Sequence, residues 1–335
     1  MYGVLGIISA NYSSDDFGDL TSQRPAASLP FGGRYRLLDF PLTNLVSSEI
    51  TTVGLITPFY YRSIMDHVGN GHPWGLAKRR GGLFVMPGTV YGDRENSCRF
   101  VLKELIRNRR LIDRSSADYV LLCDASKVMR INYDAFCRAH AASVSKATFL
   151  YTKEGHRFLD CFIIDKDYLI SLLSAYKDSD GMDLTEILKI ESKTVPMGEF
   201  EYDGYVGIVD DLKDYVRVNM DLLKPEIRSE LLTGLKTKVQ DAPPALYRES
   251  AQVCDSIISS GCIVKGEVDS SIVARNVVIE EGAVVKNSII MQRCVIGKNA
   301  HIENAILDKY VTVSSDVIIK GSEALPLVVE KDSKL

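Results

Sequence analysis

Residues 272–302 read IVARNVVIEEGAVVKNSIIMQRCVIGKNAHI, a stretch in which branched aliphatic residues recur at every sixth position. A six-residue period is typical of a left-handed parallel β-helix, in which inward aliphatic side chains stack coil on coil at about 4.8 Å. A β-sandwich is the alternative, but its period of two would not hold register at six. We therefore predict a left-handed β-helix over residues 251–335, with the periodic residues pointing inward. The unbroken series is Ile272, Val278, Val284, Ile290, Ile296 and Ile302, and Ile258/Val264 and Val311/Val317 repeat the interval on either side.

The segment before the repeats differs from them in amino-acid composition. Residues 240–250 read QDAPPALYRES, and adjacent prolines stop a helix and stiffen a connection, so we predict a linker over residues 241–250. Upstream of it, short apolar runs alternate with helical patterns, which indicates βαβ units and a Rossmann-like α/β domain over residues 1–240. Ligands of such domains bind beyond the carboxyl ends of the strands. The runs expected to be buried strands are residues 4–8, 53–56, 119–123 and 148–151.

Composition restricts the function. The chain has 335 residues, 46% hydrophobic and 25% charged, which describes a folded protein large enough for two domains. A net charge of −4 and a pI near 5.8 argue against a general nucleic-acid binder. Seven scattered cysteines without C-x-x-C spacing predict reduced thiols and no zinc site. Because no signal sequence or apolar stretch of spanning length is recognisable, we expect a cytoplasmic protein with no membrane partner.

The most informative stretch of the first domain is LPFGGRYRLLDFPLTNL at residues 29–45. Gly32 and Gly33 would let the backbone approach an anionic ligand, with Arg34 and Arg36 near enough to pair with phosphate. A solvated, salt-bridged loop is an equally good interpretation of these arginines alone.

This stretch resembles the sugar nucleotidyltransferases, most closely the glucose-1-phosphate adenylyltransferases, whose fingerprint ends in P-F-G-G-x-Y-R-I-I-D-F-x-L-S-N. Residues 67–74, HVGNGHPW, are similar to the family's H-I-G-S-G-x-x-W, and residues 204–223 resemble its D-V-G-T…N-x-x-L-L segment. The likeness extends from residue 2 to about 321. This resemblance implies the fold of enzymes that use Mg²⁺ to transfer a nucleotidyl group to a sugar phosphate and release pyrophosphate.

The sequence departs from the family where that chemistry is performed. Of the glycine-rich loop G-G-x-G-T-R-L-x-P-L-T only Gly18 remains, within a Ser9–Thr21 segment that carries three aspartates. The family's lysine falls on Ala26, its metal-binding aspartate falls on Ser126, and Lys127 replaces the next histidine. The family's G-T-A-D-A run is absent from residues 100–104. These losses resemble the non-catalytic partner subunit that accompanies a catalytic adenylyltransferase in glycogen-forming Gram-positive bacteria.

We therefore predict a regulatory subunit with no catalytic residue and no metal or cofactor of its own. Its expected partner is a catalytic homologue that uses Mg²⁺, in a hetero-oligomer that is expected to be a tetramer, and a sugar phosphate or phosphate is the expected effector. One alternative is an autonomous nucleotidyltransferase that recruits Asp124. Another is a hexapeptide acyltransferase, for which only His301 lies in the repeats. The candidate ligand or effector residues are Arg24, Arg34, Arg36, His67, Trp74, Tyr202 and Asp203.

Overall fold

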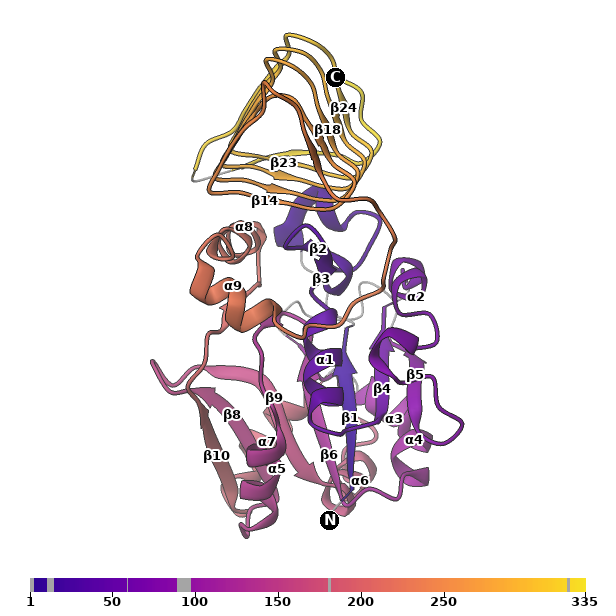
Figure 1. The fold of residues 1–335 in the computed structure, drawn as a ribbon. Coiled ribbons are helices and arrows are strands. Elements are labelled where there is room, and N and C mark those ends of the chain that lie inside the picture. The colour runs from indigo at the N-terminus through magenta and orange to yellow at the C-terminus, as the bar shows by residue number, and fades with distance from the viewer. Residues whose placement is uncertain (1–2, 11–14, 59, 89–97, 180–181, 324–325) are drawn as a thin grey trace.

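The computed structural model describes residues 3–10, 15–58, 60–88, 98–179, 182–323 and 326–335. An α/β domain forms the N-terminal part, and a triangular coil of short strands forms the C-terminal part (Figure 1). The coil lies beyond the end of the central sheet toward which strand β1 points (Figure 1).

The central sheet has seven strands in the order β10-β8-β9-β6-β1-β4-β5. All neighbouring pairs are parallel except those of β9, which runs antiparallel to both β6 and β8. The four apolar runs predicted as strands lie in β1, β4, β6 and β8, which confirms an α/β domain. The strands are β1 (Val4–Ser9), β4 (Thr52–Thr57), β5 (Gly82–Pro87), β6 (Tyr119–Asp124), β8 (Ala147–Thr152), β9 (Phe158–Asp165) and β10 (Met197–Tyr202).

Helices cover both faces of this sheet and create two hydrophobic cores. One core contains side chains of α3, α4, α6 and α7. The other contains side chains of α1, α2, α5, α8 and α9 and continues toward the coil. The α-helices are α1 (Asp39–Ser47), α2 (Arg62–Val68), α3 (Leu102–Arg107), α4 (Arg109–Arg114), α5 (Asp134–Ala141), α6 (Lys166–Ala175), α7 (Leu184–Glu191), α8 (Leu212–Asp221) and α9 (Pro225–Leu232). The 3₁₀ helices are η1 (Asp15–Thr21), η2 (Ala26–Ser28) and η3 (His72–Trp74).

Two short strand pairs position the residues of interest. Strands β2 (Pro30–Phe31) and β3 (Tyr35–Arg36) form a hairpin, and β7 (Lys127–Val128) pairs antiparallel with β11 (Gly207–Ile208). Gly33, in the turn of the hairpin, has φ of 71°, and a Cβ there would lie 2.6 Å from Ser259 Oγ. Gly33 therefore lets this turn pack against the coil. The close backbone approach that the sequence suggested for an anionic ligand is made at Gly33 to protein.

The C-terminal part is a left-handed β-helix, as predicted. Its strands stack in parallel into three five-stranded sheets. One sheet contains β12 (Leu246–Tyr247), β15 (Ile263–Val264), β18 (Val278–Ile279), β21 (Val295–Ile296) and β24 (Thr312–Val313). The second contains β13 (Gln252–Cys254), β16 (Glu267–Asp269), β19 (Val284–Lys286), β22 (His301–Glu303) and β25 (Ile318–Lys320). The third contains β14 (Ile257–Ile258), β17 (Ile272–Val273), β20 (Ile289–Ile290), β23 (Ala305–Leu307) and β26 (Leu327–Val329). Strand β12 lies inside the range predicted as a linker and already pairs with β15.

The register of the coil corrects part of the sequence prediction. Ile272 pairs with Ile289, which pairs with Ile306, so these coils repeat every 17 residues and one of their three sides has five residues instead of six. The predicted six-residue series crosses such a shift between residues 285 and 290. Its first half therefore points outward, and the prediction that Ile272, Val278 and Val284 fill the interior is wrong. The inward residues of these coils are Val273, Ile279, Val285, Ile290, Ile296, Ile302, Leu307, Val313 and Ile319.

The third sheet of the β-helix packs its outer face on the α/β domain. Ile289, Met291 and Ile306 are buried in the same core as α1 and α8. A buried ion pair between Arg24 and Asp308 also crosses the boundary. Because apolar burial and a desolvated ion pair hold this face, the two parts form a continuous packed unit at this interface.

Candidate functional site

The residues that the resemblance aligns with the family's metal site, Ser126 and Lys127, lie just after the carboxyl end of β6. Asp124 ends this strand opposite Ser9, the last residue of β1. Ser126 and Lys127 follow, and the antiparallel pairing of β7 with β11 sets Lys127 opposite Ile208. The topology of the sheet therefore places the residues where ligands of doubly wound folds bind.

The ammonium group of Lys127 occupies the centre of this site. Its Nζ donates a hydrogen bond to Ser126 Oγ at 2.6 Å. It also lies 2.6 Å from Asp160 Oδ2 and 3.4 Å from Asp124 Oδ2. Only 3% of the Lys127 side chain is exposed. Lys127 is therefore a desolvated cation held by two carboxylates and a hydroxyl.

Further charged groups close around this cluster. Arg99 Nε lies 3.6 Å from Asp124 Oδ2, and Arg99 Nη2 donates to Asp210 Oδ1 at 2.9 Å. Arg157 reaches the other oxygen of Asp210 at 3.3 Å. Asp160 takes φ of 47°, in the left-handed region that aspartate tolerates better than most residues, beside a bulge between β8 and β9. The bulge turns its carboxylate toward Lys127. We call Arg99, Asp124, Lys127, Arg157, Asp160 and Asp210 the charged cluster.

Burial and charge act against each other in the charged cluster. Burial acts to lower the pKa of Lys127, but the negative charges of Asp124, Asp160 and Asp210 outweigh it and raise the pKa. Burial raises the pKa of Asp124, and the charge of Asp160 adds to this, while Lys127 and Arg99 oppose it. The ammonium is therefore charged at neutral pH and supplies the positive charge that these carboxylates need.

The donor set does not fit Mg²⁺. This ion takes carboxylate and water oxygens in a nearly octahedral shell at about 2.0–2.1 Å, whereas these oxygens already accept from an ammonium, two guanidinium groups and Ser126 Oγ. Within the described ranges, no group of three histidine, cysteine, aspartate or glutamate side chains is arranged to hold a metal ion. Asp124, the carboxylate that an autonomous enzyme would recruit, is engaged by Ser126 Oγ at 2.5 Å.

The segment Ser9–Thr21, which the resemblance aligns with the family's glycine-rich loop, is only partly described. Asn11–Ser14 lie outside the described residues, as do the side chains of Asp15 and Asp16. The rest forms η1, with Phe17 and Leu20 buried. Ala26, where the family has its lysine, is buried in η2. In its described part this segment therefore packs inward with apolar side chains.

A second cluster of cations lies at the boundary between the α/β domain and the β-helix. Arg24 and Arg36 line a cavity of about 270 Å³ together with Lys309 and Lys331 of the β-helix. Acidic residues also line it, but within the described chain only Arg24 among these four cations pairs with one of them, Asp308. Arg36 donates to the carbonyl oxygen of Ser63 at 2.6 Å. The cavity brings two predicted effector residues together with two cations from the other domain.

Two of these cations are destabilised in their charged form. Burial, together with the positive charges of Arg36 and Arg24, lowers the pKa of Lys309 to about 7. Burial likewise lowers the pKa of Arg36 to about 10, against the opposing charge of Asp39. An anion in the cavity would stabilise both charges.

Arg34 lies apart from Arg24 and Arg36. It lines a different cavity, beside Arg275 and the residues of the predicted linker, and its guanidinium carbon lies 5.8 Å from the centre of the Tyr35 ring. His67 and Trp74 are in the interior. His67 Nε2 is 2.5 Å from Asp39 Oδ1, the His67 ring meets the Trp74 ring edge to face at 5.7 Å, and both residues are buried. Burial lowers the pKa of His67 despite the carboxylate beside it.

Tyr202 and Asp203, the last two candidates, make contacts of ordinary structure. The Tyr202 hydroxyl donates to the carbonyl oxygen of Arg130 at 3.0 Å, and Asp203 forms an exposed ion pair with Lys153 at 2.6 Å. Sequence reasoning did not find Asp160, Asp210, Arg99 or Lys309. Asp160 and Asp210 have no motif of their own, and only the pairing of the strands brings them to Lys127.

Comparisons with known proteins agree with this architecture. A model described as nucleotidyl transferase matches residues 15–157, and one described as GlmU-like, C-terminal hexapeptide matches residues 243–324. The fold and these matches define a protein of the nucleotidyltransferase class that carries a hexapeptide β-helix. None of the helices in the described ranges combines the length and hydropathy of a membrane span.

Individual relatives narrow the class. The glycogen biosynthesis protein GlgD of Bacillus subtilis (strain 168) is 31% identical over 332 residues, which cover 98% of this chain and 96% of that protein. GlgD of Geobacillus stearothermophilus is 32% identical over 287 residues, with coverage of 84% and 82%. A glucose-1-phosphate adenylyltransferase of Halalkalibacterium halodurans is 26% identical over 315 residues and 82% of each chain. The chain belongs to the family that contains GlgD and the glucose-1-phosphate adenylyltransferases.

Proposed function

We propose that this chain is a regulatory, catalytically impaired subunit of glucose-1-phosphate adenylyltransferase in bacterial glycogen biosynthesis. The observation that carries the proposal is the Lys127 ammonium among the carboxylates of Asp124 and Asp160. Nucleotidyl transfer concentrates negative charge on the transferring phosphate, which the active enzymes of this family neutralise with Mg²⁺. Lys127 forms ion pairs with those carboxylates, so they are not free to act as ligands of a metal ion.

The site also lacks the other components of transfer. Ala26 and Ser126 stand where the resemblance places a lysine and a metal-binding aspartate. The lost lysine removes a charge-assisted hydrogen bond to the triphosphate, worth about 1.5–3 kcal/mol or roughly tenfold to hundredfold in affinity. Ser126 in turn offers no carboxylate to a metal ion. We infer that this chain needs no cofactor and that Mg²⁺ is required by its catalytic partner.

The proposed action is exerted through assembly. The partner that we propose is a catalytic homologue, and the names of the relatives as glycogen biosynthesis proteins support a role in that process. The assembly is a hetero-oligomer, a tetramer by analogy with the family. The chain would bias the partner toward its more active conformation, a coupling that is typically worth about 1–3 kcal/mol, or roughly 5–150-fold in an equilibrium.

We assign the effector to the cavity of Arg24, Arg36, Lys309 and Lys331. A phosphate or sugar phosphate there would contact both the α/β domain and the β-helix, so its binding would depend on how the two parts are arranged. The lowered pKa values of Arg36 and Lys309 support an anion at this position.

Titration of a fixed amount of the catalytic homologue with this chain tests the proposal. Pyrophosphate release from ATP and glucose 1-phosphate should rise and saturate at a fixed subunit ratio, and light scattering should show one hetero-oligomer at that ratio. Activity that stays constant across the titration would contradict the regulatory role. The Asp124→Asn variant should activate as well as the unmodified chain; if it abolishes turnover by the chain alone, the autonomous enzyme is the correct interpretation.

A further inference from the structure

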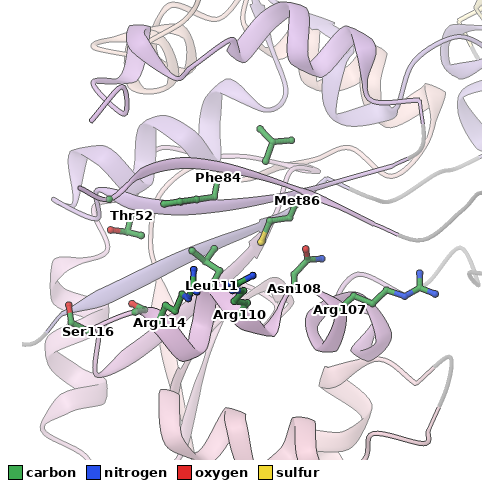
Figure 2. A pocket seen from close by; sticks show the side chains of 12 residues that line it. Thr52, Phe84, Met86, Arg107, Asn108, Arg110, Leu111, Arg114 and Ser116 are labelled. Carbon is green, nitrogen blue, oxygen red and sulfur yellow. The ribbon is translucent and has the colours of Figure 1, made fainter. Parts of the chain in front are cut away.

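A groove opens beside the edge of the central sheet, away from both clusters described above. It lies between β4 and β5 on one side and α3 and α4 on the other, with a volume of about 510 Å³ (Figure 2). Phe84 and Met86 extend from β5, whereas Leu111 and the arginines come from the helices (Figure 2). Nothing in the proposed function uses this groove.

The floor of the groove is apolar and already formed. Met86 is buried, and Leu111 packs beside it over Gly54 of β4. A Cβ at Gly54 would lie 2.6 Å from Met86 Cε and 2.8 Å from Leu111 Cδ2, so the two side chains rest directly on the strand. Phe84 stands at the opening with 41% of its surface exposed. An occupant would meet a fixed hydrophobic surface and gain from covering an aromatic ring.

The rim of the groove is uniformly positive. Arg107, Arg110 and Arg114 line it, and no acidic residue and no lysine is among its lining residues. Within the described chain these three arginines form no ion pair, although the neighbouring Arg109 pairs with Asp113 at 3.1 Å. Arginine, phenylalanine and methionine are enriched in protein–protein interfaces, whereas lysine and carboxylates are depleted there. The composition is that of an interface whose counter-charges come from another molecule.

The charge pattern also decides between two kinds of protein occupant. A second copy placed across a two-fold axis on this groove would set arginines against the same arginines, because such interfaces bring a surface against itself. Like charges facing one another across an interface are unfavourable. An added β-strand is also disfavoured, since Pro87 removes a backbone donor from the free edge of β5.

We propose that this groove docks a surface segment of the catalytic partner subunit that carries two or more carboxylates around an apolar side chain. The carboxylates pair with Arg107, Arg110 and Arg114, and the apolar side chain covers Phe84 and the floor at Met86. The inference rests on the proposed function, because the partner is the subunit with which this chain assembles.

The test measures binding of the full-length chain to the catalytic homologue by surface plasmon resonance at 50 and 300 mM salt. The variant Arg107→Glu/Arg110→Glu/Arg114→Glu should bind about 30-fold or more weakly at low salt, mainly through slower association, and lose the salt dependence. Phe84→Ser should weaken binding through faster dissociation but keep the salt dependence. The matched control Lys177→Glu/Lys189→Glu/Lys193→Glu reverses the same number of exposed charges, one after α6, one on α7 and one after α7. It should bind within about twofold of the unmodified chain.

Two results would overturn the inference, and they differ in meaning. If the unmodified chain binds the homologue and the arginine triple variant binds equally well, the groove is not the docking site and the proposed function stands. If the unmodified chain does not bind the homologue, both fail together. Circular dichroism should show that every variant is folded at the temperature of the binding assay because each changed residue is exposed, so a loss of binding reports on contact and not on folding.

Discussion

Replacing Lys127 by methionine tests whether the ammonium is the compensating charge of the charged cluster. Methionine keeps much of the length and apolar volume of the lysine stem but removes the charge. The variant leaves Asp124 and Asp160 facing one another with their shared cation gone, and Ser126 Oγ loses a donor at 2.6 Å. Breaking a buried ion pair by removing one partner costs about 3–5 kcal/mol, and we expect a loss in this range at pH 7.

The measurement is the free energy of unfolding from urea denaturation. The control is Lys146→Met, which removes an equally short ion pair, 2.8 Å to Asp165, at a lysine that is half exposed. It should lose far less stability because water replaces its partner. In the Lys127 variant the loss should shrink as pH falls from 7 toward 4. In the unmodified chain the charge of Lys127 opposes the rise in the pKa of Asp124, so its removal raises that pKa further above the unfolded value. Folding of the variant therefore takes up a proton more readily and gains more stability on acidification than folding of the unmodified chain. Equal losses for the two lysine variants would refute the reasoning.

Further predictions concern the domain boundary, the cation cavity and the coil register. Arg24→Ala should destabilise the chain by about 3–5 kcal/mol, measured by urea denaturation, because it leaves the buried carboxylate of Asp308 without its cation; a loss below about 1 kcal/mol would contradict an interface held by this pair. Sulfate keeps its charge between pH 6 and 8, whereas Lys309, with a pKa of about 7, loses its proton over that range, so sulfate binding measured by calorimetry should weaken by up to about tenfold. Lys309→Met should remove this pH dependence; if the dependence remains, a group other than Lys309 is titrating. Val285→Ala should cost about 2–3 kcal/mol and Val284→Ala less than about 1, because only the first lies inside the coil; the reverse order would restore the register predicted from the sequence.

The β-helix shows what a periodic sequence can and cannot predict. The six-residue spacing predicts the architecture correctly, because only stacked coils need aliphatic residues at that interval. It does not predict the inward set, because Val284 and Val285 are both aliphatic and a shortened side shifts the register after residue 285. Ile272 is aliphatic for another reason. It points outward against the Gly33 turn, a contact between domains that no local pattern reveals.

The charged cluster also contains residues that the sequence predicts and residues that it does not. Motif comparison identifies Ser126 and Lys127 as departures, because they lie in one continuous segment with known neighbours. It does not identify Asp160, which comes from the antiparallel strand β9 and reaches the ammonium only through a left-handed backbone conformation beside a bulge. Arg34 and Arg36 illustrate a related limit. They are two residues apart, yet they line different cavities.

The most direct measurement is pyrophosphate release from ATP and glucose 1-phosphate with Mg²⁺, by this chain alone, by a catalytic homologue alone and by their mixture. We expect no turnover from the chain alone, because Lys127 engages the carboxylates that would hold the metal ion, and a mixture that is faster than the homologue alone. Robust turnover by the chain alone would contradict the account, and a mixture no faster than the homologue would remove the regulatory role.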